Sequence, residues 1–174
     1  SWFGPHPENL SERFFEAAVE NARKILDAVK PARTTFCYEM MAWSLPDSPD
    51  ACLRLLKAVD RKAFAVHLDP CNLVHSPERY YRSNDLIREC YAKLGPHVAS
   101  VHAKDLAWEV EMAVHFREVR IGLGSIDYAV FLAEHARHAP GAPLMLEHLP
   151  GEAEYDAARD RVRAVGGSIG LGFE

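Results

Sequence analysis

Ala65-Val66-His67-Leu68-Asp69 is a short apolar run that ends in an acid, and three more runs along the chain have a similar form. These are Phe36-Cys37-Tyr38-Glu39, Ala99-Ser100-Val101-His102 and Leu144-Met145-Leu146-Glu147. The terminal residues Glu39, Asp69, His102 and Glu147 are separated by 30, 33 and 45 positions, close to the length of one strand plus one helix. A parallel β/α barrel gathers functional groups from successive strands at one face in this way.

Helical patterns separate the four runs. Apolar residues recur every three or four positions from Asn9 to Val29, where Asn9 and Glu12 form a predicted capping pair and Pro31 a predicted stop. Ser48-Pro49-Asp50 and Ser76-Pro77-Glu78 each have the form of a helix start. Two more helices are predicted from about Asp127 to Arg137 and from about Glu152 to Val165, the last ended by Gly166-Gly167. The predicted strands are Thr34–Met40, Ala63–Asp69, Val98–Ala103 and Pro143–His148.

The alternation of these elements predicts an α/β fold with a parallel sheet of about four βα units. With 174 residues we expect a single domain spanning residues 1–174. A complete eight-stranded barrel needs about 250 residues, so the expectation is a partial TIM-barrel-type sheet. Three arrangements stay open: the second half of a longer protein, a homo-oligomer whose copies complete a barrel, or a small open α/β sandwich.

Composition excludes several classes of function. The formal charge is −5 without a basic block, so we expect no nucleic-acid partner. No apolar run approaches the roughly 20 residues of a membrane span, and the first residues do not form a signal peptide. The four cysteines form no CxxC pair, which favours reduced thiols in a cytoplasmic protein.

The run-ending residues carry the candidate chemistry. Taken singly, an acid at a strand end or a histidine in a core is ordinary, but four such residues on four successive units are hard to explain by coincidence. Two Glu, one Asp and one His are a suitable ligand set for a hard or borderline divalent ion. Such an ion can hold a hydroxy-carbonyl compound and stabilise an enediolate. Glu39 and Glu147, from the first and last strands, could then remove and return a proton as a catalytic pair.

Four segments carry a more specific resemblance. They are Tyr38-Glu39-Met40-Met41-Ala42-Trp43, His67-Leu68-Asp69-Pro70-Cys71-Asn72-Leu73, Val101-His102-Ala103-Lys104-Asp105 and Met145-Leu146-Glu147-His148. Together they resemble the second half of the xylose isomerase-like TIM-barrel superfamily, within its sugar phosphate isomerase/epimerase group. The resemblance covers essentially the whole chain.

The resemblance implies one divalent ion bound by Glu39, Asp69, His102 and Glu147, with Mn²⁺, Mg²⁺ or Co²⁺ expected and Zn²⁺ a further candidate. It also implies that the two glutamates transfer a proton next to a carbonyl in a sugar or polyol-derived substrate. The predicted activity is therefore that of an isomerase or epimerase. Two alternatives stay open: a lyase or dehydratase of the same superfamily, and a catalytically silent half-barrel or interaction module.

Two positions depart from the pattern that epimerases of this group often follow. Asn72 stands where they carry a histidine, and Trp108 where they tend to carry an arginine, so the substrate is in question rather than the metal. The DNA-repair endonucleases of the superfamily need additional metal ligands, one of them at the position of Asn72. That activity is therefore not expected here.

The remaining candidate residues surround the predicted ligands. His67, Asn72, Lys104 and Trp43 are the predicted substrate contacts, and Trp43 could share an aromatic wall with Trp2 and Phe3. The period-two pattern from Trp108 to Arg120 predicts a hairpin or extended excursion at the barrel mouth, as a lid or an arm for a partner. Gly122-Leu123-Gly124 is either a phosphate loop or a flexible helix entry.

Overall fold

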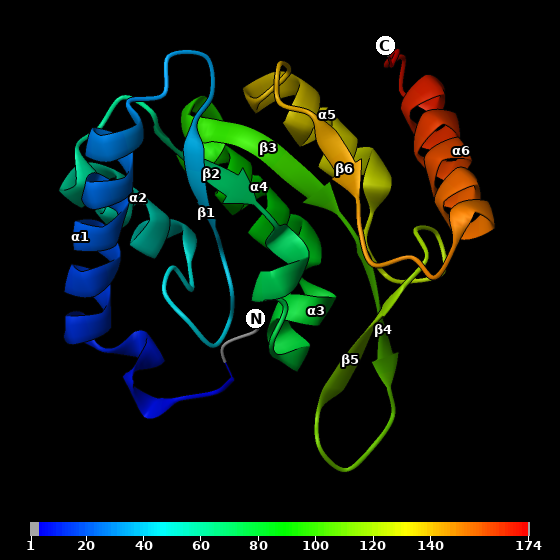
Figure 1. Cartoon of the computed structure of the whole chain (residues 1–174). Coiled ribbons are helices and arrows are strands. Elements are labelled where there is room, and N and C mark those ends of the chain that lie inside the picture. The colour runs from blue at the N-terminus through cyan, green and yellow to red at the C-terminus, as the bar shows by residue number, and fades with distance from the viewer. Residues whose placement is uncertain (1–3, 174) are drawn as a thin grey trace.

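The computed structural model describes residues 4–173, and a four-stranded parallel sheet is its centre. The strand order is β1-β2-β3-β6, so the predicted parallel α/β sheet is confirmed (Figure 1). Its strands are β1 (Phe36–Glu39), β2 (Phe64–Leu68), β3 (Val98–Ala103) and β6 (Leu144–Leu146). The remaining strands, β4 (Asp105–Glu109) and β5 (His115–Val119), pair with each other in an antiparallel hairpin that extends beyond the sheet.

The helices follow the strands in chain order and each packs against its neighbour. Contacts run from α1 to α2, α2 to α4, α4 to α5 and α5 to α6. The helices are α1 (Glu12–Val29), α2 (Pro49–Val59), α3 (Pro77–Tyr81), α4 (Ser83–Leu94), α5 (Tyr128–His138) and α6 (Glu152–Ser168), and short 3₁₀ turns cover Pro7–Leu10, Pro70–Leu73 and Gly95–His97. This succession of strand and helix is that of a partial β/α barrel. Within residues 4–173 no helix combines the length and apolarity that crossing a bilayer requires.

Serine caps begin three of the helices. Ser48 and Ser76 accept hydrogen bonds from the N–H groups of Ala51 and Arg79, as their sequence context predicts. At α1 the predicted cap is wrong, because Ser11 accepts from Phe14 N–H and Asn9 lies in the preceding 3₁₀ turn. The predicted stop is confirmed: Lys30, directly before Pro31, ends α1 in the left-handed conformation.

Two helix predictions need correction. The helix expected after Ser76 is interrupted at Arg82, which separates α3 from α4. The Tyr80 ring of α3 stacks on Phe116 of the hairpin, with 5.0 Å between centroids, and also packs against the main core. Gly166-Gly167 does not end α6, which continues to Ser168. The chain turns at Gly170 with φ 80°, and Leu171 N–H then donates to Gly166 O at 2.8 Å.

The two faces of the sheet differ in chemistry. One face packs on the helices, where Val66, Leu68 and Val101 join the main core with side chains of α4 and α5. Successive strand residues point to opposite faces, so His67 and Ser100 lie on the other side, together with Glu39 and His102. The sheet therefore has an apolar face covered by helices and a polar face that carries the predicted site.

Candidate metal centre

The four predicted ligands lie at the same edge of the sheet. Glu39 ends β1, His102 is the next-to-last residue of β3, and Asp69 and Glu147 directly follow β2 and β6. Because the strands are parallel, their carboxyl ends meet. Each of the four side chains offers one ligand atom, and these atoms all lie within 4.8 Å of one another. Residues from four separate βα units thus form one cluster.

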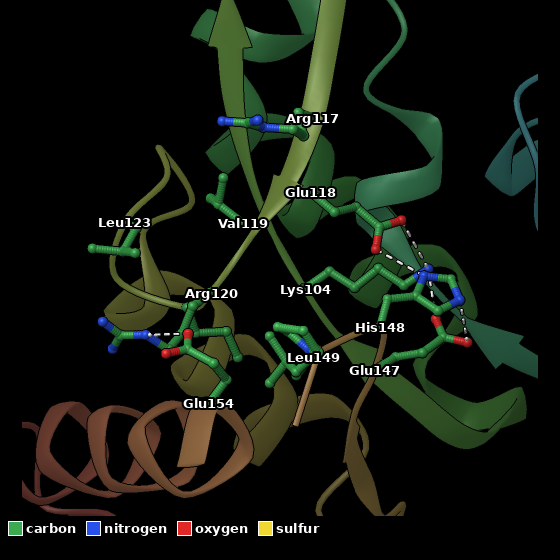
Figure 2. Close-up of a pocket in the computed structure, with 13 residues that line it drawn as sticks. Lys104, Arg117, Glu118, Val119, Arg120, Leu123, Glu147, His148, Leu149 and Glu154 are labelled. Atoms are coloured by element: carbon green, nitrogen blue, oxygen red, sulfur yellow. Dashed lines mark hydrogen bonds and ion pairs between the residues drawn. The ribbon is translucent and has the colours of Figure 1, made fainter. Parts of the chain in front are cut away.

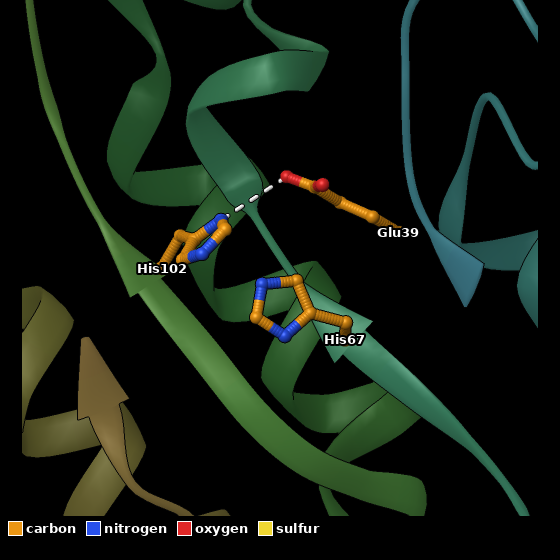
Figure 3. Close-up of side chains that lie close together, drawn as sticks. All are labelled: Glu39, His67 and His102. Carbon is orange, nitrogen blue, oxygen red and sulfur yellow. Dashed lines mark hydrogen bonds and ion pairs between the residues drawn. The ribbon is translucent and has the colours of Figure 1, made fainter. Parts of the chain in front are cut away.

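The imidazole of His102 occupies the middle of this cluster. Its Nδ1 is 3.1 Å from Glu39 Oε1, 3.1 Å from Glu147 Oε2 and 3.5 Å from Asp69 Oδ2. Figure 3 shows His102 directed at Glu39, with the His67 ring edge-on to that of His102 at 4.0 Å between centroids. One nitrogen therefore faces an oxygen from each of three carboxylates.

Lys104 supplies positive charge to the same cluster. Its side chain is only 4% exposed, and its Nζ lies 2.9 Å from Asp69 Oδ2 and 2.6 Å from Glu147 Oε2. Burial alone would lower the pKa of Lys104, but the charge of Asp69 and the hydrogen bond to Glu147 outweigh it and raise the pKa. Lys104 is thus a protonated partner of two predicted ligands.

The carboxyls respond differently to this environment. Burial, together with the charge of Asp69, raises the pKa of Glu39. Burial has the same tendency at Asp69, yet the nearby imidazole of His102 and the charge of Lys104 outweigh it and lower the pKa. Asp69 is held further by Cys71 N–H and Asn72 N–H, which donate to Oδ1 at 3.1 and 3.3 Å. Asp69 is therefore fixed as a carboxylate, while Glu39 is the more basic of the two.

The donor set fits a divalent cation. Asp69 Oδ2 and Glu147 Oε2 are buried and near charged groups, yet neither makes a hydrogen bond of acceptable geometry with the described residues. Both oxygens point at the centre where Glu39 and His102 also present an atom. Three carboxylates and one imidazole suit Mg²⁺ or Mn²⁺ as well as the softer Co²⁺ and Zn²⁺. The residues that could hold such an ion are Glu39, Asp69, His102 and Glu147.

A cavity of about 310 Å³ lies beside the cluster. Three of the predicted substrate contacts, Asn72, Lys104 and Trp43, line it together with Phe116 of the hairpin. The fourth, His67, is absent from this lining and is bound instead through Nδ1 to Ser100 Oγ at 2.5 Å. Trp2 and Phe3, proposed for the same aromatic wall, lie outside the described residues.

Asn72 bridges the cavity wall and the ligands. Its Nδ2 donates to Glu39 Oε1 at 3.0 Å, and its Oδ1 accepts from Lys104 Nζ at 3.3 Å. An amide can donate and accept at once, so it links a carboxylate to an ammonium. Asn72 therefore contacts the cluster from the side of the cavity.

Sequence reasoning missed three ionisable residues near the site. Asp105 is fully buried and its carboxylate accepts from the N–H groups of Gly122 and Gly124, so Asp105 already occupies the loop that was a phosphate candidate. Glu118 on β5 and His148 after β6 lie next to Glu147 (Figure 2). The alternation of polar residues in the hairpin and the pair Glu147-His148 were the only signals available.

Comparisons with known proteins agree with this architecture. The model of the family described as xylose isomerase-like TIM barrel matches residues 2–165. A xylose isomerase domain protein from Planctomyces limnophilus superposes with a TM-score of 0.71 and 20% identity, over 94% of this chain and 55% of that one. A search of curated proteins gave no match.

Two further solved structures share the fold. A xylose isomerase-like TIM barrel protein from Mycobacterium smegmatis, in complex with magnesium, has a TM-score of 0.67 and 18% identity over 95% of this chain and 57% of its own. D-psicose 3-epimerase with D-tagatose from Clostridium cellulolyticum H10 has a TM-score of 0.61 and 16% identity, over 87% and 56%. The chain thus spans a little over half the length of each of these three structures.

Proposed function

Because the chain belongs to the xylose isomerase-like TIM barrel family, we propose that it is the metal-binding part of a divalent-metal-dependent isomerase or epimerase. The substrate would be a sugar or a polyol-derived hydroxy-carbonyl compound. The observation that carries the proposal is the cluster of four ligand atoms within 4.8 Å at the carboxyl edge of the sheet. The sugar epimerase among the structural neighbours supports the substrate class.

The chain's own residues supply the acid and base. Glu39 and Glu147 come from the two edge strands of the sheet, so they approach a ligand in the cavity from different sides. One carboxylate accepts the proton from the carbon next to the carbonyl. The other returns a proton to the opposite face of the same carbon in an epimerase, or to the neighbouring carbon in an isomerase. Burial and the charge of Asp69 raise the pKa of Glu39, which favours its role as a base.

Other residues bind and shield the substrate. Asn72 and Lys104 present N–H groups to the cavity, and Trp43 and Phe116 add aromatic surface that excludes water. A bound divalent ion, held by Glu39, Asp69, His102 and Glu147, would polarise the carbonyl and lower the energy of the enediolate. Mn²⁺, Mg²⁺, Co²⁺ and Zn²⁺ are the candidates.

Deuterium exchange tests this proposal. The protein loaded with Mn²⁺ is incubated with a panel of ketoses in D₂O, the Mn²⁺ is then removed by chelation, and the sugars are analysed by NMR. We expect deuterium at the carbon next to the carbonyl of the true substrate. Glu39→Gln and Glu147→Gln should each abolish the exchange, whereas Glu20→Gln on the exposed face of α1 should leave it unchanged.

The same spectra separate the alternatives. A lyase or dehydratase would yield a product that has lost a fragment or water. The half-length of the chain relative to its structural neighbours favours a second candidate, a silent half-barrel, which predicts neither bound metal nor exchange. Exchange and metal content that stay at the wild-type level in Glu147→Gln would contradict the proposed mechanism.

A further inference from the structure

His148 has a backbone conformation that is uncommon among non-glycine residues. It directly follows the predicted ligand Glu147 and has a φ of 56°, in the left-handed region that few non-glycine residues occupy. Such a conformation costs free energy and persists where surrounding contacts hold it. The contacts of the His148 side chain therefore bear on why this conformation is kept.

Those contacts come from the hairpin. His148 Nδ1 donates to Glu118 Oε2 at 2.8 Å, and its Nε2 lies 3.4 Å from Glu147 Oε1 (Figure 2). The imidazole thus stands between a carboxylate of β5 and a predicted metal ligand. Because Glu118 fixes one ring nitrogen, it also fixes the orientation of the other.

Glu118 holds a second neighbour of Glu147. Its Oε1 lies 3.6 Å from Lys104 Nζ, and Lys104 lies 2.6 Å from Glu147 Oε2. Each oxygen of Glu147 therefore faces a nitrogen of a side chain that Glu118 contacts. This is the arrangement by which outer residues orient the ligands of a metal.

These four side chains also form a partition. Lys104, Glu118, Glu147 and His148 line both the cavity beside the metal cluster and a second cavity of about 300 Å³ near Arg120. A shift of Glu118 would change the wall that both cavities share. Glu118 thus connects the hairpin to the centre.

We infer that Glu118 is a positioning residue that orients the Glu147 carboxylate toward the metal through His148 and Lys104. The inference rests on the proposed function, since it assumes that Glu147 is a ligand. Glu118 is not one of the four predicted ligands. Its role is to link the β4–β5 hairpin to the affinity of the centre.

Calorimetric titration with Mn²⁺ alone tests this role in the full chain. Loss of an outer partner of a metal ligand weakens metal binding 10- to 100-fold, so we expect Glu118→Ala to weaken Mn²⁺ binding by about tenfold or more. Glu118→Gln keeps an oxygen that can accept from His148, so it should recover part of the affinity. Glu20→Gln, on the exposed face of α1, removes one negative charge and should bind Mn²⁺ like the wild type.

The visible spectrum of the Co²⁺-loaded protein gives a readout that a purely structural role would not change. We expect the absorption bands to shift in Glu118→Ala and to remain in Glu20→Gln, with similar melting temperatures. Wild-type affinity and spectrum in Glu118→Ala would overturn the inference. Equal losses in Glu118→Gln and Glu118→Ala would assign the effect to charge alone and overturn it as well. A wild-type protein that binds no metal would instead contradict the proposed function itself.

Discussion

At the scale of single residues, Lys104 allows the carboxylates of the centre to lie close together. Asp69 is fully buried, and a buried carboxylate without a compensating partner is strongly unfavourable. Lys104 gives it an ammonium at 2.9 Å and shares that charge with Glu147. The cluster is thus neutralised in part by the protein itself.

Replacing Lys104 should therefore destabilise the protein, because the carboxylates of Asp69 and Glu147 would lose their positively charged partner. Removing one partner of a buried ion pair costs about 3–5 kcal/mol, so we expect Lys104→Met to lower the free energy of unfolding of the metal-free protein by that amount. Chemical denaturation monitored by circular dichroism measures it. Lys93→Met is the matched control, because Lys93 pairs with Asp50 and Glu89 at the surface and its loss should cost about 1 kcal/mol or less. Equal destabilisation by the two substitutions would contradict the account.

The residues of the centre were predictable to different degrees. Glu39, Asp69, His102 and Glu147 could be placed near one another because each ends an apolar run and parallel strands share an edge. The pairing of Lys104 with Asp69 and Glu147 could not, since it depends on side-chain direction after the end of β3. For the same reason the role of Lys104 as a substrate contact stays a prediction.

At the scale of elements, the loop between β5 and α5 is organised by a single carboxylate. Asp105 accepts hydrogen bonds from the N–H groups of Gly122, Gly124 and Ile126, at 2.9 to 3.1 Å. Buried backbone donors need such a partner, and here it comes from the start of β4. This contact ties the base of the hairpin to the entry of α5.

Gly124 is required for that contact. A Cβ at position 124 would lie 2.2 Å from Asp105 Oδ1 and 2.5 Å from Leu106 O, so Gly124→Ala must displace buried groups. We expect a loss of about 2–3 kcal/mol in the free energy of unfolding, measured by denaturant titration. Gly141→Ala, which would meet no atom within 4 Å, should change it by less than about 1 kcal/mol. A Gly124→Ala variant whose free energy of unfolding equals that of the wild type would contradict the account in which Asp105 organises this loop.

Helix boundaries were predicted correctly where the residues that determine them lie within the same turn of the chain. Ser48 and Ser76 begin helices because their side chains cap within the same turn. The break at Arg82 lies next to Tyr80, whose ring contacts a segment distant in sequence, the hairpin residue Phe116. A local sequence pattern cannot predict a contact with a residue that is far away in the sequence.

At the scale of the whole molecule, the sheet brings together ligands that the chain spreads over more than 100 residues. The family match and the parallel order β1-β2-β3-β6 account for this convergence. That residues 1–174 form one domain, and that a second copy or further chain completes a barrel, remain predictions. Light scattering of the isolated chain would decide between a monomer and an oligomer.

The central claim is that Glu39, Asp69, His102 and Glu147 bind one divalent ion. Anomalous diffraction from crystals of this chain grown with Mn²⁺ tests it most directly. We predict a single strong peak per chain, within coordination distance of an oxygen of each carboxylate and of His102 Nδ1. A peak bound by other residues, or crystals whose density shows these four side chains in place without a peak between them, would contradict the account.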